Sequence, residues 1–414
     1  MLKNILYCVL SSFLFIMLLG TTEAKAEAPG DLFSESVILI DAKSGNILYE
    51  KDSNRSMYPA SITKIVTAII AIEEGNLEDI VTVSKNARDQ DGSRVYLLEG
   101  EKVTLEKLIQ GLMINSGNDA GTAIAEHFDG SEKAFAKRMN DFVNENIGVE
   151  DTNFVNPHGL FHKDHVTTAK DMAKIAQYAM ENDKFREIVS TKEMDWVGEG
   201  WETTLFNHHR LLWDYEGTTG VKNGFVPEAG HTLVTSAERD GMELIAVTLN
   251  AASKYYSYWD TMSLLDYGFA NFITEEIERG EMISDTAGRE YMLAKNIFVA
   301  RQDKETVALK VNKEKDLVVK VGTREHIKED VLVEQEKSIL TPVPSAASSN
   351  INGDAGPNGE TEAKTSLAST VIIFLSLFLL IFIVGIIQKR KRRKKLQHRY
   401  ANSLVYSRRN DYNR

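Results

Sequence analysis

Cysteine and positive charge are both scarce in this sequence. Among its 414 residues, Cys8 is the one cysteine. A single cysteine excludes a disulfide framework and the zinc and iron–sulfur centres that clustered cysteines hold. The 48 Lys and Arg residues face 60 Asp and Glu residues, and this net charge of −12 argues against nucleic acid as the main partner. Internal repeats and a phosphate-binding glycine loop are absent as well.

What is present is the composition of a folded protein with an uneven charge. The chain is 43% hydrophobic and 26% charged, and its length suggests two or three domains. Residues 389–414 hold eleven Lys and Arg against one acid, whereas residues 27–388 carry a net charge of −23. An acidic body with a basic tail indicates that the two parts meet different surroundings.

Residues 1–26 have the features of a secretory signal peptide. Lys3 precedes an almost wholly apolar run over residues 5–19, and Ala24 and Ala26 are the small residues that a signal peptidase reads. We expect cleavage after Ala26, which leaves a mature protein without cysteine. The alternatives are an uncleaved anchor, which the short apolar run disfavours, and a lipid anchor, which the early position of Cys8 in the run disfavours.

A second hydrophobic segment lies near the other end. Residues 367–387 contain no charge and are long enough to cross a membrane as a helix. The basic cluster at 389–395 belongs on the cytoplasmic side, so 388–414 is predicted to be a cytoplasmic tail. A nucleic-acid patch is the alternative interpretation of that cluster. Residues 341–366, rich in Pro, Gly, Ser and Ala, are predicted to form a flexible linker.

The pattern between the ends predicts an α/β fold of the α+β type. In residues 27–277, strand-like runs at both ends enclose segments with helical spacing, which favours an antiparallel sheet flanked by helices. Residues 278–340 alternate apolar and polar side chains, for example Val307, Leu309 and Val311, and predict a small all-β domain. The whole chain is therefore expected to be a secreted body held by one C-terminal membrane span.

Ser61 and Lys64 form an S-x-x-K sequence at the start of an apolar helical segment. Positions i and i+3 share a helix face, so the hydroxyl and the amine can touch. A serine hydroxyl needs a base to become a nucleophile, and a desolvated lysine with a lowered pKa can be that base. The alternative is a helix-capping serine beside a surface lysine.

Two further short sequences carry weaker signals. Ser116 and Asn118 form an S-x-N in a break between two helical segments, where a turn is the alternative interpretation. Lys222 and Gly224 form a K-x-G at the end of an apparent edge strand, where the lysine can bind a carboxylate and the glycine lets the backbone approach a substrate. The three short sequences in the order S-x-x-K, S-x-N, K-x-G indicate a shared catalytic site more strongly than any one of them does alone.

With these three motifs, the chain resembles the D-alanyl-D-alanine carboxypeptidases, the low-molecular-mass penicillin-binding proteins. The resemblance runs from about residue 35 to about residue 335. The stretches that carry it are Leu39-Ile40-Asp41-Ala42-Lys43-Ser44-Gly45, Pro59-Ala60-Ser61-Ile62-Thr63-Lys64, Asn115-Ser116-Gly117-Asn118-Asp119-Ala120, Asn156-Pro157-His158-Gly159-Leu160 and Thr168-Ala169-Lys170-Asp171-Met172-Ala173. It implies a serine β-lactamase/penicillin-binding-protein-like domain, followed here by the small all-β domain and the C-terminal transmembrane helix.

The resemblance also implies catalytic roles. Ser61 would be the acylated nucleophile and Lys64 the general base. Ser116 would assist proton transfer, and Asn118 would hold the peptide. The substrate would be a peptidoglycan pentapeptide ending in D-Ala-D-Ala, whose terminal D-Ala is lost, and β-lactams would acylate Ser61 as inhibitors. No cofactor is implied.

The third motif departs from the family pattern. The resemblance implies that Lys222 binds the terminal carboxylate and keeps Lys64 neutral, and that the backbone N–H groups of Ser61 and Phe225 form an oxyanion hole next to Gly224. The family usually has Thr or Ser between the lysine and the glycine, whereas this chain has Asn223. An amide donates hydrogen bonds to a carboxylate but cannot relay a proton as a hydroxyl does.

The sequence therefore predicts a membrane-anchored serine carboxypeptidase whose catalytic domain faces the cell wall. A catalytically weak peptide or penicillin binder, a β-lactamase, and an esterase or amidase are the alternatives. His158, His162 and His165 lie close together, but their spacing fits no zinc motif, and we assign no metal.

Overall fold

The computed structural model describes residues 28–335. The expected signal peptide, the membrane span and the cytoplasmic tail lie outside the described residues, as does the 341–366 linker. Within residues 28–335, none of the helices combines the length and the apolar character needed to cross a membrane.

A five-stranded antiparallel sheet is the centre of the fold. Its strands are β1 (Ser36–Asp41), β2 (Ile47–Lys51), β7 (Thr218–Val226), β8 (Gly230–Arg239) and β9 (Met242–Ala251), in the order β2-β1-β9-β8-β7. The sequence predicts an antiparallel sheet, and in it strands from both ends of the 27–277 segment pair directly, β1 with β9. Strand β7 lies at the edge and runs on through the K-x-G sequence to Val226 rather than ending there.

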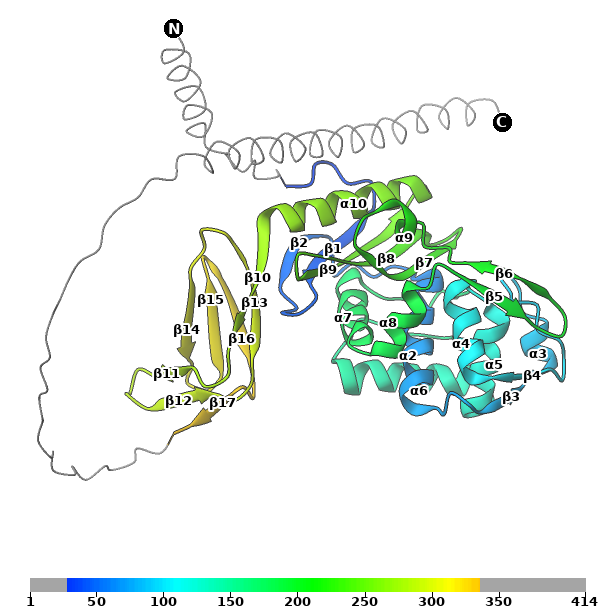
Figure 1. Cartoon of the computed structure of the whole chain (residues 1–414), viewed down its shortest axis with the longest axis horizontal. Coiled ribbons are helices and arrows are strands. Elements are labelled where there is room, and N and C mark those ends of the chain that lie inside the picture. Colours follow the sequence, from blue (N-terminus) through cyan, green and yellow to red (C-terminus); the bar gives the residue numbers. More distant parts are fainter. Residues whose placement is uncertain (1–27, 336–414) are drawn as a thin grey trace, which may run out of the picture. The chain divides into compact units, whose positions relative to one another are not determined.

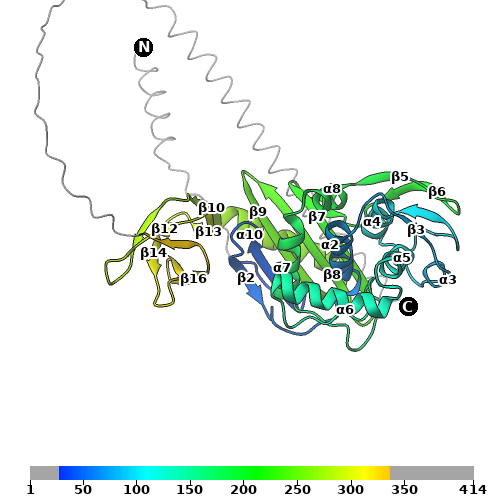
Figure 2. The same ribbon diagram turned by 90° about the horizontal axis from the view of Figure 1, so that it is seen from below.

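Helices cover both faces of this sheet (Figure 1). Helix α10 (Lys254–Asn271) packs on one face, and α2 (Lys64–Glu74), α7 (Ala169–Met180) and α8 (Asp183–Ser190) lie on the other, an arrangement that is also visible in Figure 2. Behind α2 lie α4 (Leu105–Ile114), α5 (Asn118–Asp129) and α6 (Glu132–Phe142), the last extended by a π turn, η2 (Val143–Ile147), with α3 (Lys85–Arg88) and α9 (Leu211–Asp214) as short additions.

Alternation along the central strands builds a separate core on each face. In β1, Ile38 and Ile40 belong to the cluster around α2, whereas Val37 and Leu39 belong to the cluster under α10. Because a strand presents successive side chains to opposite faces, a strand covered on both sides must be apolar at every position. All six residues of β1 are buried, and the apolar run over residues 37–40 is the reason.

Two small two-stranded sheets extend the helical side. They are β3 (Ile80–Thr82) with β4 (Lys102–Thr104), and β5 (Glu193–Val197) with β6 (Glu202–Phe206). The fully buried ring of Trp196 in β5 lies against Gly111 of α4, where an added Cβ would come within 3.0 Å of the ring. This close fit supports α4, whose C-terminal end leads into the S-x-N loop.

The region after α10 is all strands. It contains β10 (Phe272–Ile277), β11 (Met282–Ser284), β12 (Glu290–Leu293), β13 (Ile297–Gln302), β14 (Val307–Val311), β15 (Leu317–Val321), β16 (Arg324–Lys328) and β17 (Leu332–Glu334). A hydrophobic cluster separate from the two cores of the sheet holds these strands together. Strand β10 pairs with β13, so the strands begin at Phe272, before the expected boundary at 278, because the first strand follows α10 without a linker.

Polar contacts join the β strands to the first hairpin of the sheet. The Asn46 side chain accepts a hydrogen bond from the Ala300 backbone N–H at 2.9 Å, and Lys328 Nζ donates to the Ser44 carbonyl at 2.8 Å. Asp41 also accepts from the Thr274 hydroxyl. The hairpin turn thus has a structural role.

A buried carboxylate fixes the start of the described chain. Asp260 of α10 is fully buried and accepts hydrogen bonds from the backbone N–H groups of Phe33 and Ser34 at 3.1 and 2.6 Å, and from the Ser34 hydroxyl at 2.6 Å. Hydrogen bonds to a charged acceptor are stronger than those between neutral groups, so this contact holds the entry to β1 against the helix.

We expect Asp260→Asn to lower the free energy of unfolding by about 1–3 kcal/mol. The substitution replaces one carboxylate oxygen, which accepts hydrogen bonds, with an NH₂ group that would point at the N–H and O–H donors of Phe33 and Ser34. Urea unfolding measures the change. Asp31→Asn, an exposed aspartate near the same segment, is the matched control and should leave stability unchanged. Equal stabilities of both variants and the unmodified protein would contradict the role given to Asp260.

Candidate active site

Ser61 and Lys64 are brought together by a tight helical start. A 3₁₀ turn, η1 (Ala60–Thr63), leads directly into α2, which begins at Lys64. The Lys64 amine lies 3.0 Å from the Ser61 hydroxyl, as the S-x-x-K spacing predicts. The same amine donates to Asn118 Oδ1 and to the backbone carbonyl of His158, each at 2.7 Å. Three oxygen atoms from three segments therefore surround one nitrogen.

Burial makes the Lys64 amine a base. The side chain is fully buried, and its pKa lies well below the ordinary lysine value, chiefly because of desolvation. The positive charge of Lys222 lowers this pKa further, and the carboxylate of Asp119 opposes the shift. Burial raises the pKa of Asp119 itself, while hydrogen bonds from the backbone N–H groups of Val95 and Leu97 lower it.

Lys222 is a second buried lysine, on the edge strand β7. It is 1% exposed, and burial lowers its pKa to about 7. Its Nζ donates to the Asn223 backbone carbonyl at 3.0 Å and lies 3.5 Å from the Asn223 side-chain oxygen. The amide oxygen of Asn223 is thus turned towards the lysine, a position in which its N–H donors are left for another group.

Gly224 allows the edge strand to approach the nucleophile. A Cβ atom at this position would lie 2.7 Å from the Ser61 backbone nitrogen and 2.6 Å from the Thr232 hydroxyl oxygen. Thr232 donates to the Pro59 carbonyl at 2.8 Å and so ties β8 to the start of η1. Phe225, the next residue of β7, is 54% exposed. The backbone approach expected of the K-x-G glycine is therefore present.

The S-x-N loop joins α4 to α5 and brings Asn118 into the network. Ser116 is buried on this loop and has a left-handed backbone (φ 60°), which is uncommon outside glycine and is found at constrained functional sites. Asn118 donates from its Nδ2 to the Asp91 carbonyl at 2.6 Å while its Oδ1 accepts from Lys64. Both ends of the Asn118 amide thus bond to the protein itself, whereas the resemblance implies that this side chain holds the substrate peptide.

Sequence reasoning missed the carbonyl of His158 as a partner of Lys64. The turn that carries it is fixed by Thr67, which donates to the Pro157 carbonyl at 2.6 Å. Gly159 has a φ of 87°, and a Cβ there would meet the Ala60 carbonyl oxygen at 1.9 Å. The 156–160 stretch contributes to the resemblance, but a backbone acceptor leaves no side-chain pattern that a sequence motif could reveal.

Each of the three histidines near this turn accepts a hydrogen bond from a different backbone N–H, which for His162 is that of Asp164. His165 lies 2.8 Å from the Thr63 hydroxyl through Nε2 and accepts from the Val155 N–H through Nδ1. His158 Nδ1 accepts from the Leu160 N–H, and its Nε2 lies 3.6 Å from Glu132. Burial lowers the pKa of His165 to about 3. Within residues 28–335, no group of His, Cys, Asp and Glu has a geometry suited to a metal ion.

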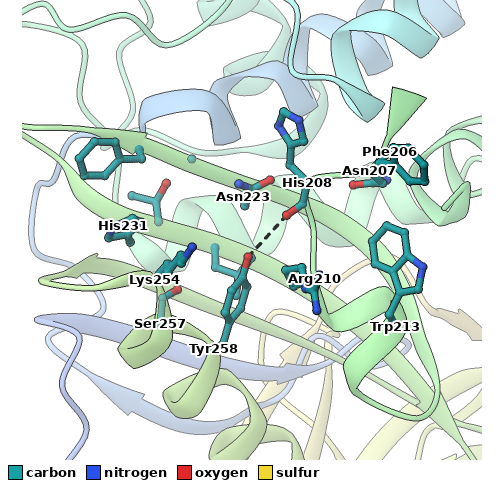
Figure 3. Close-up of a pocket in the computed structure, with 14 residues that line it drawn as sticks. Phe206, Asn207, His208, Arg210, Trp213, Asn223, His231, Lys254, Ser257 and Tyr258 are labelled. Carbon is teal, nitrogen blue, oxygen red and sulfur yellow. Dashed lines mark hydrogen bonds between the residues drawn. The ribbon is translucent and has the colours of Figure 1, made fainter. Parts of the chain in front are cut away.

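A cavity of about 640 Å³ adjoins β7 (Figure 3). Asn223, Gly224 and Phe225 form one wall, and side chains from β8, α9 and α10 complete it. Arg210 and Lys254 bring positive charge, and Trp213 and Phe206 are exposed aromatic residues at its lining. Its size is typical of a site for a small molecule or a short peptide.

Comparisons with known proteins agree with this geometry. The profile of the D-alanyl-D-alanine carboxypeptidase family matches residues 22–253. The chain is similar to D-alanyl-D-alanine carboxypeptidase DacF of Bacillus subtilis, with 32% identity over 292 residues, covering 69% of this chain and 74% of that protein.

Solved structures are similar as well. Penicillin binding protein 5 from Haemophilus influenzae has a TM-score of 0.65 at 26% identity and covers 75% of this chain and 97% of its own. A Streptomyces DD-transpeptidase has a TM-score of 0.56 at 31% identity and covers 59% of this chain and all of its own. These structures share the α/β penicillin-binding fold.

The two buried lysines lead to a pH-dependent stability. The folded pKa of Lys222 is near 7 and its ordinary value is 10.5, so above about pH 7 the unfolded chain binds more protons than the folded protein. Stability from this residue therefore rises with pH between those values, by at most about 1.4 kcal/mol per pH unit. In Lys222→Met, we expect a flatter rise when unfolding by urea is measured at about pH 7, 8 and 9. Parallel curves for the two proteins would contradict a depressed pKa.

Proposed function

The chain belongs to the D-alanyl-D-alanine carboxypeptidase family, and from this we propose that it removes the terminal D-alanine from peptidoglycan stem peptides through an acyl-enzyme. It is a serine-type peptidase. The observation that carries the proposal is the dehydrated Lys64 amine 3.0 Å from the Ser61 hydroxyl. A base in hydrogen-bond reach of a serine is the arrangement that acyl transfer requires.

The partners of Lys64 favour the neutral, basic form of its amine. A neutral amine has two N–H donors and one lone pair. Asn118 Oδ1 and the His158 carbonyl accept hydrogen bonds only, so they take both N–H groups. The lone pair is then left to accept the proton of the Ser61 hydroxyl, whose oxygen lies 3.0 Å from the amine nitrogen. Lys222, by lowering the pKa of Lys64, supports the same form at neutral pH.

In the reaction, Ser61 Oγ bonds to the carbonyl carbon of the penultimate D-Ala as Lys64 takes the hydroxyl proton. The backbone N–H groups of Ser61 and Phe225 stabilise the oxyanion, which the close approach of Gly224 to Ser61 supports. The C–N bond breaks, the departing amine of D-alanine gains a proton by way of Ser116, and water then hydrolyses the ester. β-Lactams acylate the same serine.

Lys222 and Asn223 hold the terminal carboxylate in this proposal. A carboxylate beside the buried Lys222 favours its charged form and attracts it by charge, while Asn223 donates from its amide. One N–H of the Asn118 amide donates to the Asp91 carbonyl, and the second N–H is the donor for the peptide. Loss of the terminal D-Ala removes a donor for cross-linking and so limits cross-linking of the wall.

The rest of the chain supports a membrane-anchored enzyme facing the cell wall. We propose that residues 1–26 are removed as a signal peptide and that 27–277 form the peptidase domain, followed by a small β domain that ends near 340. The uncharged segment 367–387 and the basic run after it support one span with the tail, 388–414, in the cytoplasm. The 341–366 linker then spaces the enzyme from the membrane.

We expect the secreted body, residues 27–340, to release D-alanine from diacetyl-Lys-D-Ala-D-Ala. Ser61→Ala should abolish release, because no other hydroxyl in the described residues lies within 3.0 Å of Lys64. Released D-alanine is measured directly, and mass spectrometry separates hydrolysis from transfer to an added amine. If fluorescent penicillin labels Ser61 but no D-alanine appears, the carboxypeptidase proposal fails and a penicillin-binding sensor takes its place.

Asn223→Thr is the informative companion variant in that assay. It restores the usual family residue without changing charge. A matching kcat/KM in both proteins means that the amide serves as well as a hydroxyl, whereas a gain of about tenfold or more in the variant means that Asn223 slows the chemistry.

The anchoring proposal is tested by truncation in the bacterial host. The full chain should stay with the membrane fraction, and a chain ending at 366 should release its penicillin-binding activity into the medium. A chain ending at 395 keeps the span and the basic run and is the control. Retention of the chain that ends at 366 on the membrane would place the anchor elsewhere.

A further inference from the structure

A row of three side chains leads from strand β7 to the start of α10. Phe225 of β7 lies opposite His231 of β8 in the sheet register, and their rings stack with centroids 4.5 Å apart. His231 in turn faces Lys254. Burial is the main cause of the lowered pKa of this histidine, and the positive charge of Lys254 lowers the pKa further. All three residues line the cavity beside β7, and Figure 3 shows His231 and Lys254 on the same side of it.

Lys254 is the unmatched charge of this cavity. Arg210 is paired with Asp214 at 3.3 Å, and the lowered pKa of His231 leaves that ring neutral at neutral pH. Among the described residues, Lys254 forms no ion pair, and its Nζ lies 5.3 Å from the ring centroid of Tyr255. The lining contains no Asp or Glu.

This positive lining contrasts with the rest of the body. Residues 28–335 hold 33 Lys and Arg against 53 Asp and Glu, a net charge of −20. The body as a whole therefore repels acidic ligands at long range, whereas the wall of this cavity beside β7 contains no acidic residue and attracts them at short range. The contrast points to an anionic group on the ligand that the cavity receives.

The direction of the substrate follows from the order of residues on β7. The terminal carboxylate lies at Lys222, and the reacting carbonyl lies at Gly224, which is packed against the Ser61 backbone nitrogen. Traced from its terminal carboxylate back towards its N-terminus, the peptide therefore follows β7 in the direction of increasing residue number, antiparallel to the strand. The residue that precedes D-Ala-D-Ala comes next, beyond Phe225, where the row of side chains ends at Lys254.

We propose that Lys254 selects substrates whose residue before D-Ala-D-Ala carries a negatively charged side chain, with His231 and Phe225 forming the wall along which that side chain lies. This inference rests on the proposed function and adds the substrate class. A carboxylate on a long side chain gains attraction from Lys254, and an ammonium in the same place is repelled.

Three tripeptides that differ in one group test the proposal. The residue before D-Ala-D-Ala is Nε-acetyllysine, lysine with a free ammonium, or 2-aminopimelate, whose carboxylate sits on a chain of equal length. We expect kcat/KM for D-alanine release to rise from ammonium to neutral to carboxylate, by about threefold at each step, the size of an exposed ion pair. At high salt the three values should converge.

Charge reversal supplies the matched variants. Lys254→Glu should invert the order, and an acidic residue in the first turn of α10 is favourable for the helix, so the fold is retained. Lys313→Glu changes the net charge equally at an exposed site in the turn between β14 and β15 and should keep the original order. An unchanged order in Lys254→Glu, or a preference for the ammonium peptide in the unmodified protein, overturns the proposal.

A binding readout separates this proposal from the proposed function. Each tripeptide is also tested for protection of Ser61 from fluorescent penicillin. If no D-alanine is released but protection follows the carboxylate order and inverts in Lys254→Glu, the substrate preference stands and the carboxypeptidase proposal fails. If D-alanine is released equally from all three peptides, the carboxypeptidase stands and the role of Lys254 is wrong.

Discussion

The site depends on placing two lysine amines out of water on neighbouring elements. Burial and mutual repulsion keep the pKa of Lys64 low, and burial alone lowers that of Lys222 to about 7. Such desolvation is costly unless the neutral form finds acceptors. The Asn118 side chain and the His158 carbonyl are those acceptors, which is why the S-x-N loop and the 156–160 turn must both reach α2.

The remaining geometry follows from how closely three backbones meet at η1. Gly159 and Gly224 have no side chain where a Cβ would clash with Ala60 or Ser61. Ala60 and Ser116 take left-handed backbone conformations that non-glycine residues rarely adopt. Strain of this kind persists only where surrounding contacts hold it, and here the apolar α2 and the sheet provide them.

Much of this arrangement could be predicted from the sequence. The strand-like runs at both ends of residues 27–277 predicted an antiparallel sheet, and the S-x-x-K spacing predicted the contact between Ser61 and Lys64. Side-chain motifs could not reveal the His158 carbonyl, because a backbone acceptor is present at every residue and only the fold selects one. They also could not show that Asn118 is already bonded to the Asp91 carbonyl, or that the β strands start directly after α10.

The edge position of β7 has a consequence for self-association. An edge strand leaves a row of unpaired N–H and C=O groups, which a substrate peptide can join as a sixth strand but which another copy of the chain can join as well. Natural sheets protect such edges with charge, bulges or cover. Because Lys222 is buried, its charge does not protect the edge of β7 from pairing with another chain. The irregular register near Thr218 and the close approach of η1 to Gly224 limit such pairing instead. The close approach of η1 to Gly224 therefore restricts which extended chains can pair with this edge.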